Sequence, residues 1–295
     1  SDLLHSAYHI PCDEINSLLR DRFNNIWLGS IGGGVLMIDT KQSPFAFYSL
    51  NLAEDDVPTT AVRALFADAD KDLWLGTGSY GLARKDYETG VLSFFSHIPE
   101  FSDIPSVPTV NYIIQRKNGE VWFATYDGGI LIYEKGEKVK VLTESDTPYL
   151  YSDCVSALCE DSKGNCWVGC RGGMGISLAD GGHYRFGTLS FAGGGLADWY
   201  HVKDIVEDAD GSFWIATANY GIIHIMGDVQ HPETLKYSNY SYNNGQLATN
   251  SVLCLHVDKS GRLWAGTEGG GLYLYDYKEN VFTEKNQEYQ LSADM

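Results

Sequence analysis

Trp199 and Tyr200 are the two residues of this sequence whose side chains are best suited to holding a ligand. Sugar rings have apolar faces that stack on aromatic rings, while nearby amides and carboxylates take their hydroxyl groups. The pair lies in an irregular segment, 190–200. Further aromatic residues occupy comparable segments: Phe101, Tyr149, Tyr151, Tyr240 and Tyr242. The alternative interpretation is that these rings pack their segments against the rest of the fold.

Polar side chains recur at two further sets of positions, which a sequence repeat defines. The first set contains Arg63, Asn111 and Lys203, whose two cations could hold a carboxylate or a hydroxyl-rich ligand through charge-assisted hydrogen bonds. The second set comprises Tyr80, Tyr126, Asp127, Arg171, Asn219, Tyr220 and Glu268. A solvated channel with a polar lining would have the same composition, so both interpretations stay open.

No local catalytic motif is present. The sequence contains neither G-x-S-x-G nor H-E-x-x-H, and its six cysteines form no paired C-x-x-C motif for zinc. His183 and His201 could serve a lyase, although the spacing identifies no partner for them. The Asp-rich turns 68–72 and 208–212 lack the length and the terminal Glu of a calcium loop. We therefore expect no enzyme activity, no cofactor and no bound metal.

Six of the seven tryptophans recur at intervals of 47, 48, 45, 47 and 50 residues. They are Trp27, Trp74, Trp122, Trp167, Trp214 and Trp264. Each stands in a segment of the pattern apolar, Trp, apolar, small and usually Thr, and such short apolar runs between turn residues are typical of buried strands. A Trp on a fixed grid is expected in the core, so we assign these six to structure.

A hairpin turn and an earlier strand precede each Trp strand, and a Gly-rich link with two more strands follows it. Asn-Gly at 118–119 and Asp-Gly at 210–211 are strong hairpin signals, because the favoured turns need positive φ. One four-stranded antiparallel sheet cannot bury both of its faces, but radially stacked sheets bury them for each other. We therefore predict an all-β fold, a β-propeller of six four-stranded blades; part of a seven-bladed propeller is the alternative.

The predicted blades lie within a single domain that spans residues 1–295. Their approximate bounds are 12–50, 60–97, 108–143, 153–192, 200–238 and 250–286. In such blades, the links between second and third strands leave the sheet on the same face as the connections between blades. The second set of polar residues lies in those links. The second position of each first strand, near that face, is held by Asn16, Arg63, Asn111, Ser156, Lys203 and Leu253. We therefore expect a ligand on this face, beside Trp199 and Tyr200.

The charge of the chain narrows its partners. With 295 residues and a formal net charge of −18, its surface repels phosphate backbones and anionic lipid, so we expect neither nucleic acid nor membrane contact. No apolar run reaches the roughly 20 residues that a membrane span needs. Residues 1–5 lack the basic-then-apolar layout of a signal peptide.

The repeat resembles the two-component regulator propeller repeat, approximately V-x-x-I-x-x-D-x-x-G-x-L-W-I-G-T-x-x-G-G-L. Residues 62–82 and 252–272 follow this pattern most closely. Arg116 replaces the usual Asp in the third copy. Cys170 replaces the Thr in the fourth copy, where we expect residues 171–175 to lengthen the link. The resemblance implies the periplasmic sensor region of a hybrid two-component regulator, in a family that usually detects glycan fragments.

On this basis we expect a sensing module that binds an oligosaccharide or a similar polar ligand. Two alternatives stay open: a polysaccharide lyase or glycosidase on the same fold, and a protein-interaction scaffold that forms a homodimer. No kinase, receiver or helix-turn-helix segment is present in the 295 residues, so we expect this chain to be one piece of a larger sensor.

Overall fold

The computed structural model describes residues 15–21, 26–30, 34–39, 43–48, 61–78, 80–186, 188–190, 196–198, 201–231 and 234–286. The chain divides into two compact units, residues 1–142 (unit 1) and residues 143–295 (unit 2). Within the described residues, no helix has the length and the apolar character needed to cross a membrane.

Unit 1 contains three four-stranded antiparallel sheets in its described residues, each with its strands in sequence order. The first sheet comprises β1 (Ile15–Arg20), β2 (Ile26–Ser30), β3 (Gly34–Asp39) and β4 (Ser43–Tyr48). The second comprises β5 (Val62–Ala67), β6 (Leu73–Thr77), β7 (Leu82–Lys85) and β8 (Leu92–Phe94). The short helices η1 (Phe95–His97) and η2 (Pro99–Phe101) follow, and then the third sheet: β9 (Val110–Gln115), β10 (Val121–Thr125), β11 (Ile130–Tyr133) and β12 (Lys140–Leu142).

Unit 2 repeats the arrangement in three more four-stranded sheets among its described residues. The first comprises β13 (Val155–Glu160), β14 (Cys166–Cys170), β15 (Gly173–Ser177) and β16 (His183–Phe186). The second comprises β19 (Val202–Glu207), β20 (Phe213–Thr217), β21 (Ile222–Met226) and β22 (Lys236–Tyr240). After η4 (Tyr242–Asn244), the third comprises β23 (Val252–Val257), β24 (Leu263–Thr267), β25 (Gly271–Asp276) and β26 (Val281–Glu284).

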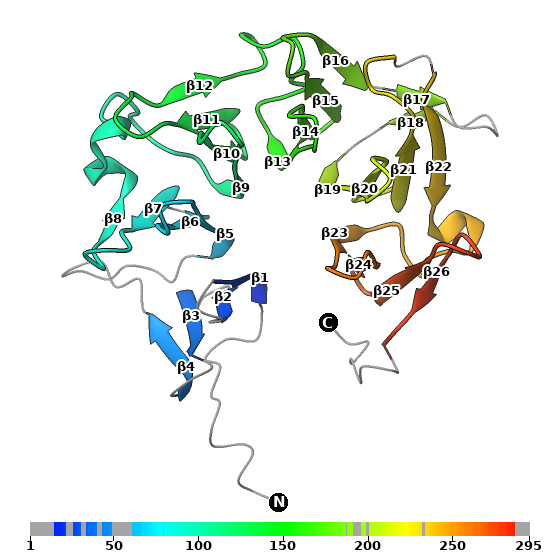
Figure 1. The fold of residues 1–295 in the computed structure, drawn as a ribbon, viewed down its shortest axis with the longest axis horizontal. Coiled ribbons are helices and arrows are strands. Elements are labelled where there is room, and N and C mark those ends of the chain that lie inside the picture. The colour runs from blue at the N-terminus through cyan, green and yellow to red at the C-terminus, as the bar shows by residue number, and fades with distance from the viewer. Residues whose placement is uncertain are drawn as a thin grey trace, which may run out of the picture. The chain divides into compact units, whose positions relative to one another are not determined.

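The first strands of successive sheets are neighbours within each unit. In unit 1, β5 contacts both β1 and β9, and in unit 2, β19 contacts both β13 and β23. Within each unit, the first strands gather on one side while the fourth strands lie on the other (Figure 1). The described residues therefore form six four-stranded antiparallel blades, and the predicted all-β propeller fold is confirmed.

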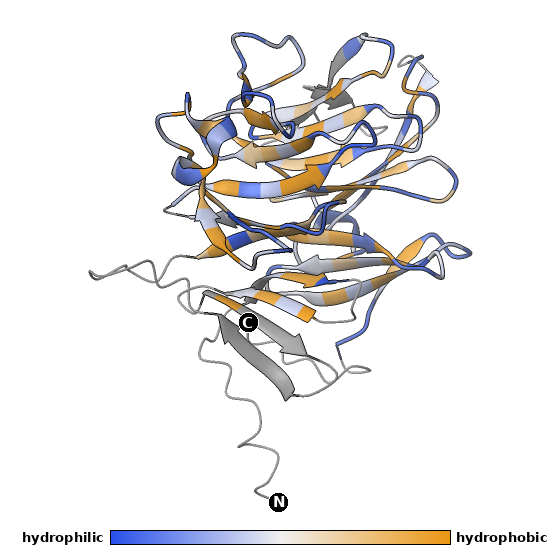
Figure 2. Ribbon diagram, turned by 60° about the vertical axis from the view of Figure 1, so that its left-hand side comes forward, coloured by the Kyte–Doolittle hydropathy of each residue, from blue (hydrophilic) through white to orange (hydrophobic). Residues whose placement is uncertain are grey.

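Most of the recurring tryptophans are buried, and four of them join neighbouring sheets. Trp74, Trp167 and Trp214 are completely buried, Trp27 and Trp122 are almost so, and Trp264 is half-buried. Four of them pack into an apolar cluster with residues of the following sheet, such as Trp74 with Phe123. Apolar residues accordingly concentrate along the strands, whereas the turns are hydrophilic (Figure 2). The core assignment of these residues follows from the inability of one sheet to cover its own faces.

Each recurring indole N–H donates to a carboxylate. Five of these acceptors are the Asp residues that lie six positions before the Trp, with N–O distances of 2.7–3.1 Å: Asp21, Asp68, Asp161, Asp208 and Asp258. In the third copy, where Arg116 replaces the Asp, Trp122 donates to Glu120 at 2.9 Å instead. The Arg116 guanidinium lies 4.8 Å from the centre of the same indole ring. The departure from the repeat thus keeps the hydrogen bond and adds a cation–π contact.

Two connections differ from the sequence predictions. The expected lengthening of the link after Cys170 is wrong, because β14 ends at Cys170 and β15 begins at Gly173. In other sheets a Thr hydroxyl holds a longer link by accepting a link N–H, as Thr125 does from Gly128, and the Cys thiol is a much weaker hydrogen-bonding group. The segment 190–200 is also not wholly irregular, since β17 (Thr188–Ser190) pairs with β18 (Leu196–Asp198).

Candidate functional site

Every first strand carries a β-bulge at its second residue. In β5, Val62 pairs with Thr77 and Ala64 pairs with Gly76, so Arg63 is an extra residue in the ladder. The same register shift occurs in β1, β9, β13, β19 and β23. The bulged residues are Asn16, Arg63, Asn111, Ser156, Lys203 and Leu253. Because a bulge re-aims its side chain, these six positions are where the blades depart from regular alternation.

A backbone hydrogen bond holds each of the last five bulges beside the link of its own sheet. The first link residue donates its N–H to the carbonyl oxygen of the residue just before the first strand, at 2.9 Å in all five cases. The donor–acceptor pairs are Gly78 and Ala61, Tyr126 and Thr109, Arg171 and Cys154, Ala218 and His201, and Glu268 and Ser251. We call these entry residues, bulges and links the bulge face of each unit.

The bulge face of unit 1 comprises residues 61–63, 78, 80–81, 109–111 and 126–129. Arg63 is exposed and folds over the link, so that a Cβ on Gly78 would lie 3.6 Å from Arg63 Nε. Tyr126 and Asp127 are exposed at the neighbouring link, and Asn111 is half-buried. Tyr80 has a structural contact, since its ring packs edge-on against Phe94. The second and third blades thus present different side chains on this face, although their backbones match.

The bulge face of unit 2 comprises residues 154–156, 171–172, 201–203, 218–221, 251–253 and 268–270. It brings Arg171 of one sheet toward His201 and Lys203 of the next. Burial, together with the positive charges of Lys203 and Arg171, lowers the pKa of His201 from 6.5 to about 4. Arg171 is exposed and Lys203 half-buried, and among the described residues no carboxylate forms an ion pair with either. The two cations of Arg171 and Lys203 and the neutral imidazole of His201 therefore lie close together and are at least partly accessible to solvent.

The remaining predicted ligand contacts of unit 2 are of two kinds: some make hydrogen bonds within the fold, and others are exposed to solvent. Tyr220 donates its backbone N–H to Thr217 Oγ1 at 2.9 Å and is half-buried, whereas Asn219 beside it is exposed. Glu268 is exposed and accepts a hydrogen bond from Ser251 Oγ at 2.7 Å. Leu253 is an exposed apolar bulge. This face thus carries exposed polar side chains together with the exposed apolar side chain of Leu253.

Some of the aromatic residues outside the Trp repeat have a structural role. Phe101, Tyr149 and Tyr240 are buried, which agrees with the interpretation that such rings pack their segments against the blades. Tyr242 is exposed. Trp199 and Tyr200, the main predicted ligand contacts, lie outside the described residues, as does the side chain of Asn16, so their roles stay predictions.

Two features of the site were missing from the sequence prediction. The sequence analysis named His201 as a possible lyase residue, but it did not predict His201 as a ligand contact beside Arg171 and Lys203. The bulges also have a sequence signal, because buried residues recur at i and i+3 in the first strands, as in Val155 and Leu158 or Val202 and Ile205. Strict strand alternation allows even spacings only, so an odd spacing between two buried residues indicates one extra residue.

Comparisons with known proteins agree with this architecture. Residues 9–32, 152–172 and 246–269 match the family model described as two component regulator propeller. No curated protein matches the chain.

Several solved structures resemble the fold. A catalytically inactive variant of virginiamycin B lyase from Staphylococcus aureus with quinupristin has a TM-score of 0.68 at 15% identity, over 94% of this chain and 86% of that one. PorZ, a surface component of the type-IX secretion system of Porphyromonas gingivalis, has a TM-score of 0.65 at 20% identity, over 88% of this chain and 38% of that one. The extracellular domain of the putative hybrid two component system BT4673 from B. thetaiotaomicron matches at a TM-score of 0.48 and 19% identity. That match covers 93% of this chain but 36% of the BT4673 domain, so this chain spans about a third of its length. At these identities the likeness establishes the fold alone.

Proposed function

We propose that this chain, which carries two-component regulator propeller repeats, is the extracytoplasmic ligand-sensing propeller of a two-component signalling protein. The family match supports a sensor propeller, and the bulge face supports the binding role. On this proposal the ligand is an oligosaccharide or a similar polar molecule, held at the bulge face of unit 2.

The cluster of Arg171, His201 and Lys203 is the observation that carries the proposal. The whole chain has a net charge of −18, yet this face collects two cations with no described carboxylate paired to them. A guanidinium and an ammonium donate strong, charge-assisted hydrogen bonds to carboxylates and hydroxyl groups. His201 is uncharged at neutral pH because its pKa lies near 4, so it can accept or donate a hydrogen bond without adding repulsion.

Trp199 and Tyr200 complete the proposed site. They directly precede His201 in the sequence, and aromatic side chains with a few placed polar groups are typical of small-molecule sites. In this proposal, the rings stack on the apolar face of a sugar while Arg171 and Lys203 take its acidic or hydroxyl groups.

Thermal-shift measurements on an oligosaccharide panel test the proposal. The panel contains cellotetraose, xylotetraose, tetragalacturonate and a heparin-derived tetrasaccharide. A ligand that binds only the folded state raises the Tm, and we expect at least one member to do so. Lys203→Ala should abolish that rise, whereas Lys278→Ala, at an exposed turn after β25, should retain it. A rise of equal size in Lys203→Ala would contradict the assignment of the site.

A second candidate function, a polysaccharide lyase, rests on His201. An uncharged imidazole beside two cations could remove the proton next to a uronate carboxylate that Arg171 and Lys203 neutralise. A base with a pKa near 4 is weak at neutral pH, however, and efficient general bases have pKa values near the operating pH. Binding is therefore the better-supported function. Appearance of unsaturated uronate products from tetragalacturonate, lost in His201→Gln, would establish the lyase instead.

A further inference from the structure

His224, in the second sheet of unit 2, lies face to face with the recurring indole of its own sheet. It is the register partner of Trp214, and the centres of the two rings are 3.7 Å apart with an angle of 2° between their planes. His224 Nε2 also shares a hydrogen bond of 2.8 Å with the hydroxyl of Ser212. The imidazole is half-buried and Ser212 is buried. A titratable ring is therefore part of the packing of this sheet.

Among the six described four-stranded sheets, this position holds a histidine in one sheet only. Four sheets have an apolar residue as the register partner of the recurring Trp: Met37, Ile132, Ile176 and Leu274. The fifth has Arg84, the partner of Trp74, whose guanidinium always stays charged in a protein. Histidine instead changes its charge between about pH 5 and pH 8. At this position the charge therefore depends on pH beside Trp214 and is fixed beside the other five recurring tryptophans.

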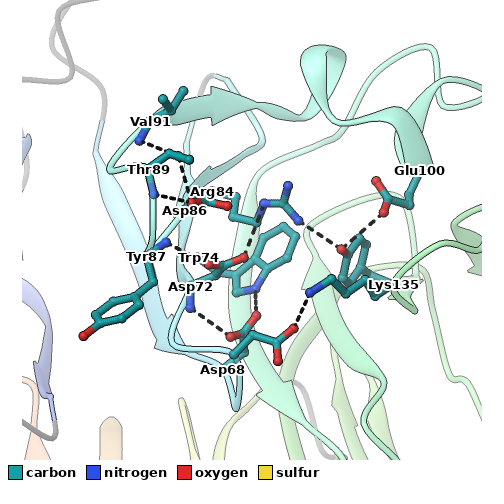
Figure 3. Close-up of polar contacts among 12 residues, drawn as sticks. Asp68, Asp72, Trp74, Arg84, Asp86, Tyr87, Thr89, Val91, Glu100 and Lys135 are labelled. Carbon is teal, nitrogen blue, oxygen red and sulfur yellow. Dashed lines mark hydrogen bonds and ion pairs between the residues drawn. The ribbon is translucent and has the colours of Figure 1, made fainter.

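The second sheet of unit 1 shows how a permanent cation is accommodated at this position. The Arg84 guanidinium carbon lies 5.4 Å from the centre of the Trp74 ring, and Arg84 Nε lies 3.8 Å from the Asp72 carboxylate (Figure 3). Arg84 also donates to Tyr133 Oη at 3.0 Å. Asp72 and Ser212 both stand two residues before their Trp. The sheet of unit 2 therefore has a hydroxyl group where the sheet of unit 1 has a carboxylate that balances the cation.

Burial and two carboxylates have opposite effects on the charge of His224. Burial lowers the pKa of His224 below its ordinary value of 6.5, and it outweighs Asp210 and Asp208 of the preceding hairpin turn, which raise that pKa. The other elements packed around the stacked rings contribute neutral groups. β22 places Ser238 opposite His224, and β25 places the phenol of Tyr275, whose pKa burial raises, 4.6 Å from the indole. The folded chain thus favours an uncharged imidazole, with two carboxylates near enough to attract a charged one.

One of these carboxylates, Asp208, joins the second sheet of unit 2 to the third. Its Oδ2 accepts a hydrogen bond of 2.8 Å from the Trp214 indole and another of 2.8 Å from the hydroxyl of Tyr277, in the turn after β25. Its Oδ1 accepts the backbone N–H of Ala209 at 2.7 Å. Burial raises the pKa of Tyr277, so its hydroxyl keeps the proton that it donates. A positive charge on His224 would attract the same carboxylate that holds Tyr277.

From this arrangement we propose that His224 is a pH-sensitive switch, which weakens the contact between the second and third sheets of unit 2 when it takes up a proton. The charged ring carries a hydrogen on Nε2 and donates it to Ser212 Oγ. Its charge draws the carboxylates of Asp208 and Asp210 toward the ring, and the hydrogen bond between Asp208 and Tyr277 weakens. The switch lies wholly within unit 2 and does not depend on a ligand at the bulge face.

The direction of the effect follows from the pKa of His224. Because this pKa is lower in the fold than in the unfolded chain, the unfolded chain takes up its proton first as the pH falls. The stabilisation by the neutral ring is fully present above about pH 6.5 and is lost as the pH falls through the lower pKa of the folded state. The contact should therefore be intact at neutral pH and weakened at acidic pH.

Hydrogen–deuterium exchange of the full chain at pH 7 and pH 5, corrected for intrinsic exchange rates, tests the switch without any ligand. Backbone hydrogen bonds within the turns 208–212 and 276–280, such as Gly211 N–H to Asp208 and Asn280 N–H to Asp276, make their exchange a measure of local opening. We expect protection in both turns to fall at least threefold at pH 5. His224→Gln, which retains a hydrogen-bonding group without a titrating ring, should show no such fall. Proton NMR of the imidazole signals follows the titration of His224 itself.

Three further variants separate the switch from a general effect of acid. His183→Gln, at an exposed histidine of the first sheet of unit 2, should respond to pH as the unmodified chain does. Tyr277→Phe should lose protection of the turn 276–280 already at pH 7 and show no further loss at pH 5. The double variant His224→Arg/Ser212→Asp, which introduces the charged pair of the second sheet of unit 1, should show protection that does not depend on pH.

Several results would overturn the proposal. One is an equal fall of protection in His224→Gln and in the unmodified chain. Another is unchanged protection in the unmodified chain while the His224 signal titrates, or a His224 signal that does not titrate above pH 4. A normal response to pH in Tyr277→Phe would also overturn it, because the hydrogen bond to Asp208 would then not carry the effect.

Discussion

At the scale of single residues, one carboxylate connects the hairpin turn of a blade to the Trp of its next strand. Asp161 accepts hydrogen bonds from the backbone N–H groups of Lys163 and Asn165 as well as from the Trp167 indole. The Asp of the turn and the Trp of the strand therefore recur together. In the third copy two residues replace the single Asp. Asn118 accepts a hydrogen bond from the backbone N–H of Glu120, and the Glu120 carboxylate accepts one from the Trp122 indole.

Replacing this carboxylate should be costly. Asp161 is completely buried and also accepts from the Asn165 side chain at 2.8 Å, so Asp161→Ala leaves several buried donors without an acceptor. We expect a loss of roughly 2–4 kcal/mol in the free energy of unfolding. Urea denaturation measures it, with the exposed Asp180→Ala of the same blade as control. Equal losses in the two variants would show that the buried contacts contribute little.

His201 makes stability depend on pH. Its pKa is lowered to about 4 in the fold, whereas an unfolded histidine titrates near 6.5. Between these values the unfolded chain binds a proton that the folded chain does not. The folded state therefore loses stability, relative to its stability above about pH 6.5, as the pH falls toward 4.

We therefore expect the stability of His201→Gln to fall less than that of the unmodified chain between pH 7 and pH 5. Urea midpoints at the two pH values measure the difference, and other titrating groups cancel in the comparison. The exposed His183→Gln should behave as the unmodified chain does. Parallel pH profiles for the His201 variant and the unmodified chain would refute the assignment.

At the scale of elements, the strands were predictable and the bulges were not recognised. Apolar runs, turn dipeptides and the Trp grid predicted four strands per repeat, and the structure forms them in both units. The spacing of Val202 and Ile205 contains the bulge signal, but it is one odd interval within an otherwise alternating strand. The short link after Cys170 escaped prediction for a related reason, because its length depends on whether a Thr hydroxyl is present to hold the turn.

The glycine that ends the link before β21 is required by the close approach of a neighbouring backbone. Gly221 has a φ of 74°, and a Cβ at that position would lie 2.1 Å from the carbonyl oxygen of Tyr240. Gly211 has a similar φ of 80° but no atom within 4 Å of such a Cβ. Gly211→Ala should therefore cost about 1–2 kcal/mol through backbone conformation alone.

Gly221→Ala should cost more than Gly211→Ala, by about 1–3 kcal/mol, because the added methyl also collides with packed backbone. Thermal unfolding of the two variants makes the comparison directly. Similar Tm values would mean that the link can move away from β22, and that its geometry does not constrain the bulge face.

At the scale of the whole molecule, the net charge of −18 conceals local surfaces of opposite sign. The sequence analysis placed Arg171 and Lys203 on one face, but Arg171 lies thirty positions before His201 in the chain, so its approach to His201 was not predicted. Repeats thus predict the framework, whereas the sites lie where single copies depart from it.

Hydrogen–deuterium exchange with and without a ligand from the oligosaccharide panel tests the central claim most directly. A ligand bound at the bulge face of unit 2 should slow exchange in peptides that cover 151–172 and 199–219, while the turn 276–280 exchanges unchanged. Protection that is absent from both of those segments, at a concentration that saturates the chain, would contradict the proposed sensing face.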